Sequence, residues 1–529
     1  MSNKPVSENA RLTKAASIVG SATLLSRLFG LIRDVVTAGF FGAGLFSDAF
    51  FVAFRIPNLL RSLFAEGSLS VAFIPVFTEC YIHEGKAEAF KLAGAAVRWL
   101  AFLLLVVSIA GIFFSPFIIR FMAPGFAASP EKLSITIHLA RMMFPYIFFI
   151  GMVALSMGIL NVLGHFTAPA LAPVVLNVAM ICSVFVISPY MSDPVTGLAI
   201  GVLVGGFFQL AMQLPFLARK GFYFWHKTKL YHPGLKKIGR LMLPSIFGAA
   251  VYQINILIST LLASLLEEGS VSYLYYADRL VQFPLGIFAV ATATAVLPSL
   301  SRQASARDFD SFRNTFSLAL RLVLFMTIPS MAGLIVLREP IIGLLFERGA
   351  FDAQATRLTA FALLYYTSGL WAFAAVKIVV STFYALQDTL TPVKIAAVSI
   401  AANLLLGIIL MGPMGHGGLA LSTSLASVLN LTLLVWVLRK RLGHLKWRNI
   451  FSSACKTVMC SAIMGGCVWM IAAYTVLDGK NTFLMLLGKI SACLTAGAVI
   501  YVVLSFIMKS SELDTVMKTL KKSVIKSEQ

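Results

Sequence analysis

The chain has 529 residues, of which 59% are hydrophobic and only 12% are charged. A water-soluble protein of this length needs much more polar surface, so the composition excludes a soluble fold. The formal net charge of +21 would suit a nucleic-acid partner. However, the basic residues stand mainly in short loops between apolar segments, and no nucleic-acid-binding pattern accompanies them. We therefore expect a membrane protein with no nucleic-acid partner.

Apolar stretches near the roughly 20 residues that cross a bilayer recur along the whole chain, without the alternation of a β-barrel. They predict an all-α polytopic membrane protein with fourteen transmembrane helices. The expected spans are 15–40, 46–76, 91–118, 133–160, 167–188, 197–218, 238–265, 272–299, 313–337, 356–383, 391–411, 417–438, 452–476 and 483–508. The first apolar run contains Arg27 and lacks a small-x-small cleavage pattern, so we expect a retained first helix rather than a signal peptide.

Loop charges predict the orientation of the spans. The loops after spans 6 and 12 are rich in lysine and arginine and carry no acid, which places them in the cytoplasm. The loop after span 7 offers Glu267 and Glu268, and belongs on the opposite side. Alternation then gives cytoplasmic N- and C-termini, in agreement with the lysine-rich tail.

An internal repeat divides the chain. GLAIGVLVGGFFQLAMQLPFLARKG from Gly197 matches GLALSTSLASVLNLTLLVWVLRKRLG from Gly418, and two further pairs of segments share an offset of about 220 residues. We predict two pseudo-symmetric six-helix lobes, related by an axis along the membrane normal, with the substrate path between them. The predicted divisions are 1–220 for the N-lobe, 221–441 for the C-lobe, and 442–529 for spans 13 and 14 with a basic tail.

Charged residues inside the apolar spans are the candidate functional groups, because each costs at least about 2.5 kcal/mol at the bilayer centre. Asp48 and Arg55 are two helical turns apart and able to pair, and Asn58 is one turn from both Arg55 and Arg61. The first two spans contain or adjoin Arg27, Arg33, Asp34, Asp48, Arg55, Arg61 and Glu66; span 8 adds Asp278 and Arg279, and span 10 adds Lys377.

The excess of basic groups indicates an anionic substrate, and the rigid donor fork of arginine suits phosphate oxygens. Snorkelling, topological anchoring and neutralised pairs are the structural alternatives, which we leave open for Arg61 and Glu66 because they lie near a helix end. We expect Arg27, Arg33, Arg279 and Lys377 to line a cavity.

No enzyme is expected. The seven histidines are scattered, and the chain has neither a phosphate-binding Gly-Lys-Ser/Thr loop nor a nucleophile elbow. The six cysteines follow no metal-ligand or disulfide spacing and are interpreted as packing residues. We expect no cofactor and no bound metal; transport would be driven by the membrane potential, a monovalent-cation gradient or downstream use of the product.

Several motifs carry a family resemblance that covers nearly the whole chain. SRLFGLIRD, SDAFFVAFRIPNLLRSLFAEGSLSVAFIPVF, APGF, FPYI, YYADRLVQFPLG and QDTLTPVKIA resemble the MurJ (MviN) family of lipid II flippases, within the multidrug/oligosaccharidyl-lipid/polysaccharide exporter superfamily. The resemblance implies transport of lipid II, the undecaprenyl-diphosphate-linked disaccharide pentapeptide, across the bacterial inner membrane for peptidoglycan synthesis. Membrane lipids and cell-wall synthases are the further partners it suggests, and spans 13 and 14 would form a groove for the polyprenyl tail.

The resemblance also assigns residues. It implies that substrate is bound by Arg27, Arg33, Arg61, Arg279 and Lys377, with gating or support from Ser26, Asp48, Arg55, Asn58 and Asp278. Gln282 departs from the glutamate of some relatives. Asp388 resembles a position near which some relatives bind sodium, but an aspartate before Thr391 and Pro392 is more typical of a turn, so no ion site is assigned.

Two other classes of function are compatible with the sequence: a different transporter of the same superfamily, and a non-transporting scaffold. A related polysaccharide-lipid flippase or a cation-coupled drug exporter would share the fold, although a drug exporter should present acidic and aromatic groups to its substrates. A membrane scaffold for cell-wall synthases would need no basic residues in its spans, and should tolerate substitution of Arg27 or Arg279.

Overall fold

The computed structural model of the chain describes residues 8–62, 69–224, 231–475 and 483–518. In these residues the regular structure is helical apart from one isolated β-bridge between Arg348 and Phe351, which confirms the predicted all-α class. Two compact units are present: Met1–Ser272 with Arg348–Phe351, and Tyr273–Glu347 with Asp352–Gln529. The two units are defined by which residues contact one another and not by the internal repeat. They therefore do not test the predicted boundaries of the two lobes, which stay predictions.

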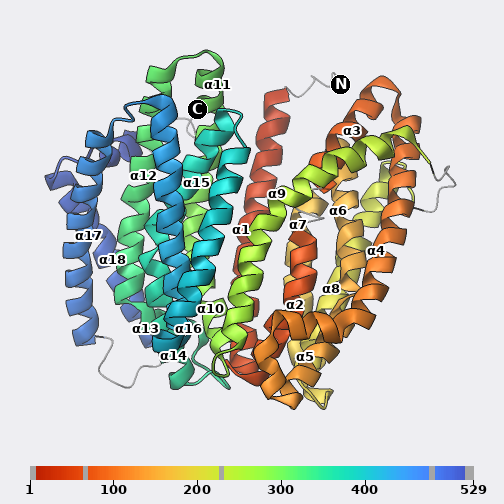
Figure 1. The fold of residues 1–529 in the computed structure, drawn as a ribbon, viewed down its shortest axis with the longest axis horizontal. Coiled ribbons are helices and arrows are strands. Elements are labelled where there is room, and N and C mark those ends of the chain that lie inside the picture. The colour runs from red at the N-terminus through yellow and green to blue at the C-terminus, as the bar shows by residue number, and fades with distance from the viewer. Residues whose placement is uncertain (1–7, 63–68, 225–230, 476–482, 519–529) are drawn as a thin grey trace, which may run out of the picture. The chain divides into compact units, whose positions relative to one another are not determined.

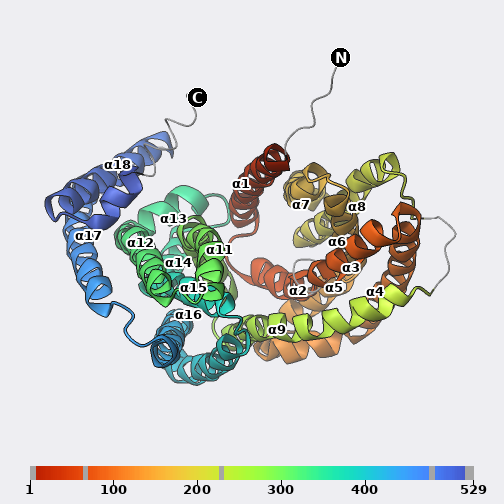
Figure 2. The same ribbon diagram turned by 90° about the horizontal axis from the view of Figure 1, so that it is seen from above.

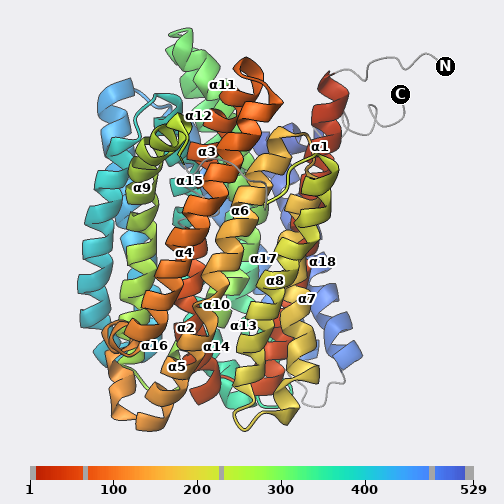
Figure 3. The same ribbon diagram turned by 90° about the vertical axis from the view of Figure 1, so that its right-hand side faces the viewer.

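The first unit is a bundle built around α6, which contacts α2, α3, α4, α7 and α8 (Figures 1 and 3). A Cβ on Gly151 of α6 would lie 2.2 Å from Leu104 Cδ1 of α4, so glycine here allows the two helices to pack closely. The helices of this unit are α1 (Glu8–Phe41), α2 (Leu45–Arg61), α3 (Leu69–His83), α4 (Lys86–Met122), η2 (Pro124–Ala128), α5 (Pro130–Met143), α6 (Tyr146–Val162), α7 (Thr167–Val186), η3 (Ser188–Tyr190), α8 (Val195–Arg219) and α9 (Pro233–Ser264).

A four-residue loop from later in the sequence completes this unit. The N–H of Ala350 donates to the carbonyl of Gly39 at 2.9 Å. Gly349 has a φ of +56°, and a Cβ there would lie 2.2 Å from the Gly39 carbonyl oxygen. Gly42 has a φ of +67°, and a Cβ on it would lie 2.5 Å from the Ala350 carbonyl oxygen. Glycines on both sides therefore allow the loop to sit directly on the end of α1.

In the second unit, α10 (Ser270–Pro284), which starts in the first unit, runs into a π-helical turn, η4 (Leu285–Val290), and then into α11 (Ala291–Ser305). Pro284 has no N–H to donate to the preceding turn, so the regular α-helical hydrogen bonding is interrupted there and a wider turn can follow. The further helices are α12 (Phe309–Val336), α13 (Arg338–Phe346), α14 (Ala353–Ser368), α15 (Leu370–Ala385), α16 (Leu390–Leu442), α17 (Trp447–Thr475) and α18 (Phe483–Ile507).

The last two helices pack against each other and against α12 (Figure 2). Tyr501 of α18 donates its hydroxyl to the carbonyl of Phe325 in α12 at 2.7 Å, and the two rings lie 5.1 Å apart. Cys460 and Cys493 are buried in the same apolar cluster. Two of the six cysteines thus have the packing role expected from the sequence.

Exposed aromatic side chains show that the bundle needs a lipid solvent. Leaving one phenylalanine side chain in water rather than burying it costs about 1.5–3 kcal/mol. Helix α4 exposes five of them: Phe102, Phe113, Phe114, Phe117 and Phe121. Such a surface is stable only where hydrocarbon surrounds it.

The positions of the predicted spans agree with the helices. Within the described residues nine helices are long and apolar enough to cross a membrane, and the pair α14–α15, bent by 42°, would be a tenth. Helix α16 contains predicted spans 11 and 12, separated at Gly415, whose φ of 54° and ψ of −135° are not helical. The more polar α1, α2–α3 and α9 coincide with spans 1, 2 and 7. The count of fourteen is consistent with this structure and stays a prediction.

Candidate substrate-binding and gating residues

Arg33 is buried in the first unit, where α1 packs on α7. Its Nη2 lies 2.6 Å from Asp34 Oδ1, and its Nη1 donates to Asn177 Oδ1 at 3.1 Å. Asn177 in turn donates its amide to the backbone carbonyl of Ser26 at 3.3 Å. Arg33 therefore fastens α1 to α7 in this structure, and its contact with substrate stays a prediction.

Asp48, near the start of α2, is 1% exposed and accepts four hydrogen bonds. Lys132 Nζ donates to its carboxylate at 2.7 Å, and the N–H of Gly269 at 2.8 Å. The N–H and Oγ of Ser272 donate at 2.9 and 2.6 Å. Gly269 and Ser272 belong to the beginning of α10, where unpaired N–H groups and the helix dipole favour an anion. Asp48 thus caps the helix that carries Arg279.

Lys132 is a functional candidate that the sequence did not reveal. The sequence suggested Arg55 as the partner of Asp48, two turns along the same helix, but Lys132 of α5 forms the ion pair. Lys132 is 6% exposed, and its ammonium lies 4.3 Å from the centre of the Phe126 ring. A lysine at the start of a span is typical of a topology signal, and nothing in the sequence alone distinguishes this one.

Arg61 lies at the C-terminal end of α2 and is half-buried. Its Nε and Nη2 both donate to Asn58 Oδ1, at 3.1 and 3.0 Å, which confirms the one-turn relation predicted for these two residues. Arg55 lies on the same helix and is also half-buried. Glu66 lies outside the described residues.

Arg27 is exposed on α1, between the exposed apolar side chains of Leu24 and Leu28. It makes no hydrogen bond or ion pair with another described residue. A guanidinium facing lipid without a partner would cost at least about 2.5 kcal/mol. Arg27 therefore needs water or an anionic ligand to be stable within the membrane.

Arg279 is exposed on α10 in the second unit. Its Nε and Nη2 donate to the hydroxyl of Tyr275 at 3.2 and 2.9 Å, and its guanidinium lies 5.1 Å from the centre of that ring. One turn further, Gln282 donates its amide to Asp278 Oδ1 at 3.3 Å. Tyr275 thus holds the guanidinium against the helix, a support that the sequence did not indicate.

Lys377 is an exposed cation on α15, a helix whose other residues are mostly buried. It forms no hydrogen bond or ion pair with another described residue. Like Arg27, Lys377 is therefore a charge within a predicted span that has no protein counter-ion among the described residues.

Asp388 lies in the turn before α16, outside the predicted spans. It accepts from the N–H and Oγ1 of Thr391 at 2.9 and 2.6 Å, and Arg441 Nη1 lies 2.6 Å from its Oδ2. Burial raises the pKa of this carboxyl, but the bonds from Thr391 and the charge of Arg441 outweigh burial and lower the pKa overall. The expected turn role is confirmed, and a guanidinium serves as its counter-ion.

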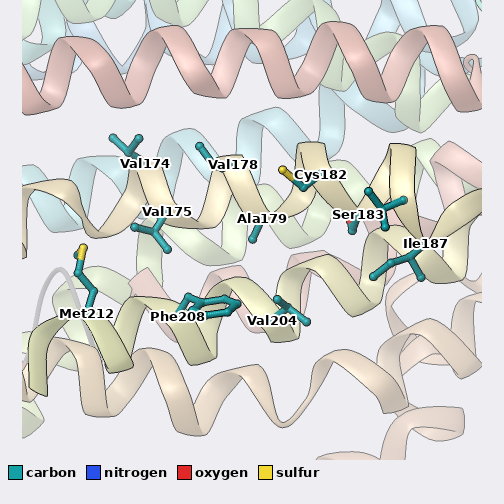
Figure 4. A pocket seen from close by; sticks show the side chains of 11 residues that line it. Val174, Val175, Val178, Ala179, Cys182, Ser183, Ile187, Val204, Phe208 and Met212 are labelled. Carbon is teal, nitrogen blue, oxygen red and sulfur yellow. The ribbon is translucent and has the colours of Figure 1, made fainter.

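An apolar groove of about 590 Å³ lies between α7 and α8 in the first unit (Figure 4). Cys182 and Ser183 are its most polar lining residues, and the other side chains are aliphatic, aromatic or methionine. The groove offers no cation to a charged head group. Gly201 and Gly205 allow α8 to approach α7 beneath it, since a Cβ on Gly201 would lie 2.0 Å from Ser183 Oγ.

One group of metal-ligand type lies near the start of α9. Cys80, Glu84 and His232 bring their ligand atoms within 4.8 Å of one another. However, His232 Nδ1 accepts the N–H of Gly234 at 3.0 Å as the N-cap of α9, and its Nε2 lies 3.4 Å from Glu88. Coordination by Nε2 would need the proton on Nδ1 and would break the cap. We therefore interpret the group as a helix cap.

Comparison with known proteins identifies the family of this chain. The model of the family "Lipid II flippase MurJ" matches residues 37–508. The probable lipid II flippase MurJ of Vibrio cholerae serotype O1 is 40% identical over 475 residues, which cover 88% of this chain and 90% of that protein. The chain belongs to the MurJ family. It is therefore a multi-pass protein of the bacterial inner membrane.

Solved structures agree with this assignment. The structure titled "Lipid II flippase MurJ, inward closed conformation" is 29% identical, covers 93% of this chain and 98% of that chain, and has a TM-score of 0.77. An inward-facing multidrug resistance MATE family transporter shares the fold, with a TM-score of 0.68, at 17% identity, over 82% of this chain and 99% of that chain. Arg27 and Arg33 precede the residues matched by the MurJ family model. Their assignment as substrate-binding residues therefore depends on their surroundings in this chain.

Proposed function

We propose that the protein transports lipid II from the cytoplasmic to the periplasmic leaflet of the bacterial inner membrane. The observation that carries the proposal, beyond family membership, is the exposure of Arg27, Arg279 and Lys377 on apolar helices. A diphosphate cannot cross roughly 30 Å of hydrocarbon unaided. Exposed cations in predicted spans are the groups that would stabilise its phosphates on the way.

The residue roles follow from what each cation already contacts. We assign diphosphate binding to Arg27 and Arg61 in the first unit and to Arg279 and Lys377 in the second. Arg33 would contribute only in a conformation in which Asp34 and Asn177 release it. Its substitution should therefore affect folding more than substrate affinity.

Asp48 supports the same function indirectly. By capping α10 it fixes the start of the helix on which Arg279 and Asp278 lie. Ser26, Arg55 and Asn58 are assigned a supporting role beside the binding arginines. Access to the head group would alternate between the two sides of the membrane while the tail remains in lipid.

The proposed transporter also needs an energy source, an orientation in the membrane and a consumer of its product. The protein would act as a transporter and not as an enzyme, without a cofactor, coupled to the membrane potential or to a monovalent cation. Both termini would lie in the cytoplasm, as the loop charges predict. Cell-wall synthases, which consume the translocated precursor, are the proposed protein partners.

A related polysaccharide-lipid flippase is the second candidate, because its substrate also carries a lipid diphosphate. A drug exporter of the same superfamily is less compatible with the site, since its cationic substrates would be repelled by exposed arginine and lysine. The lipid that accumulates in the cytoplasmic leaflet on depletion distinguishes the two flippases. It should be lipid II and not a polysaccharide precursor.

The test combines complementation of a depleted strain with flipping of lipid II in proteoliposomes. Arg27→Ala and Arg279→Ala should each reduce lipid II affinity about tenfold to hundredfold, the effect of one charge-assisted bond. Arg120→Ala is the matched control, because Arg120 is an exposed arginine on α4 with no hydrogen bond or ion pair to another described residue. Normal flipping by both alanine variants at native expression would overturn the assignment.

A further inference from the structure

A polar pocket of about 300 Å³ lies in the second unit, where α17 begins and the chain leaves α18. It is distinct from the exposed cations discussed above. Arg321 of α12 contributes to it, together with the first turns of α17 and the residues that follow α18. The lining residues are Arg321, Asn449, Ser452, Ser453, Lys456, Lys509, Ser510, Ser511 and Glu512.

We propose that this pocket binds the phosphate group of an anionic glycerophospholipid of the cytoplasmic leaflet, through Lys456 and Lys509. Nothing in the assigned transport function requires such a site, and the proposal does not depend on lipid II being the transported substrate.

The pocket has an excess of positive charge. Its one acid, Glu512, is already neutralised, because Arg321 Nη1 lies 2.7 Å from Glu512 Oε1 with both side chains largely buried. Ser510 donates to the other carboxylate oxygen at 2.8 Å. Two cations, Lys456 and Lys509, then remain without an acidic partner in the pocket. A single phosphodiester would offset part of this charge.

Both lysines line the pocket, and one of them contacts the backbone next to the other. Lys456 Nζ donates to the carbonyl of Met508 at 3.0 Å, which places it beside the peptide that leads into Lys509. An ammonium has three N–H donors, so this bond uses one of the three at Lys456. Both side chains line the same pocket, so an anion bound there would be stabilised by two positive charges.

Further donors in the pocket have no acceptor. The Nε of Arg321 is buried without a hydrogen-bond partner. The hydroxyl of Ser452 and the side-chain amide of Asn449 are exposed in the pocket and make no hydrogen bond with another described residue. A buried donor such as Arg321 Nε is rarely left unpaired, and a phosphate offers several strong acceptor oxygens. The volume corresponds to roughly ten water molecules, which is enough for a phosphate and its ester groups.

The depth of the pocket matches that of lipid head groups. Helices α17 and α18 are both apolar enough to span the bilayer. Lys456 lies in the third turn of α17, and Lys509 comes directly after the last turn of α18. Both helices therefore end at this pocket, in the interfacial layer outside the hydrocarbon core.

The leaflet in which the pocket is predicted to lie contains anionic lipids. The basic segment that leads into α17 carries Lys446, with Arg448 in the first turn of the helix, and no acid, which predicts that this end of α17 lies in the cytoplasmic leaflet. Basic pockets between spans on that side bind anionic head groups. A glycerophospholipid is favoured over a polyprenyl diphosphate because anionic glycerophospholipids are the standing anions of that leaflet, and the pocket of about 300 Å³ has room for one phosphate with its ester groups.

The test uses the purified full-length protein in detergent and measures binding of short-chain phosphatidylglycerol, with phosphatidylcholine as the neutral lipid. Lys456→Gln combined with Lys509→Gln should weaken phosphatidylglycerol binding about tenfold to hundredfold. Lys518→Gln is the matched control, since Lys518 is exposed in the helical segment 511–518 but does not line the pocket. Arg321 is left intact, because its loss would leave Glu512 buried without a partner.

Thermal unfolding of each variant shows that the fold is kept. Equal affinity of the double variant and the wild type for phosphatidylglycerol would overturn the site. Two further probes distinguish the source of the phosphate. Inorganic phosphate that binds as tightly as the lipid, with the same sensitivity to the lysines, would overturn the lipid assignment. Undecaprenyl diphosphate that displaces phosphatidylglycerol at a lower concentration would show that the occupant is the polyprenyl lipid, and would overturn the choice of a glycerophospholipid.

Discussion

The buried contact between Asp48 and Lys132 allows a quantitative prediction. Asp48→Ala removes a carboxylate that is 1% exposed, and leaves the Lys132 ammonium and three donors of Gly269 and Ser272 without their acceptor. Breaking a buried ion pair by removing one partner costs about 3–5 kcal/mol. Lys132→Met should cost less, about 1–3 kcal/mol, because the carboxylate keeps its three other donors.

The double variant should then be no less stable than Asp48→Ala alone, since it no longer contains a buried unpaired ammonium. The resulting coupling energy is at least the cost of Lys132→Met alone, about 1–3 kcal/mol. Unfolding titrations of the four proteins in mixed micelles measure it. The exposed pair Asp310–Arg313, at 3.0 Å, is the control and should couple by less than about 0.5 kcal/mol. Additive effects at Asp48 and Lys132 would refute the reasoning from burial.

Two further predictions concern packing and pH. Gly125→Ala should destabilise the protein by about 1–3 kcal/mol, because the new Cβ would lie 1.9 Å from the backbone oxygen of Ser264. Gly239→Ala is the control, since a Cβ there would meet open space and should not destabilise the protein. Equal thermal midpoints of the two variants would contradict the predicted clash at Gly125. Asp388→Asn should destabilise the protein at pH 7, because a carboxyl with a lowered pKa contributes stability above its usual pKa of about 3.9 and loses it as the pH falls through the folded value. The difference in midpoint between wild type and Asp388→Asn should shrink below about pH 4, and a constant difference from pH 7 to pH 3 would exclude the contribution of Arg441.

The sequence predicted the spans well because crossing a bilayer requires long apolar runs, and hydropathy detects these directly. It also drew attention to Asp48, since a carboxylate in an apolar span needs a partner. The break at Gly415 was expected from the gap between spans 11 and 12. The short helices η2, η3 and α13 were not, because elements of three to nine residues leave no periodic pattern.

Partners across the bundle could not be predicted. Local spacing suggested Arg55 for Asp48, and it correctly related Arg61 to Asn58, because one-turn neighbours are fixed by the helix itself. The pair formed by Asp48 and Lys132 joins residues 84 positions apart in the chain. Arg33 was expected to face a cavity but is buried against α7, because rotation of a helix about its axis is set by packing and not by its own sequence.

The loop Arg348–Phe351 has a consequence for biosynthesis. Helices α1 to α9 leave the ribosome long before this loop, which follows Ser272 by about 75 residues, yet the loop belongs to the first unit. The end of α1 at Phe41 precedes Ala350 by about 310 residues, so at about 5–20 residues per second it waits on the order of 15 to 60 s for Ala350 to be synthesised. During that interval Gly39 and Gly42 lack the backbone that covers them in the finished protein. A ribosome stalled shortly before residue 348 should therefore hold a chain whose first unit is more open to proteolysis near Gly42 than one stalled after residue 351 has emerged.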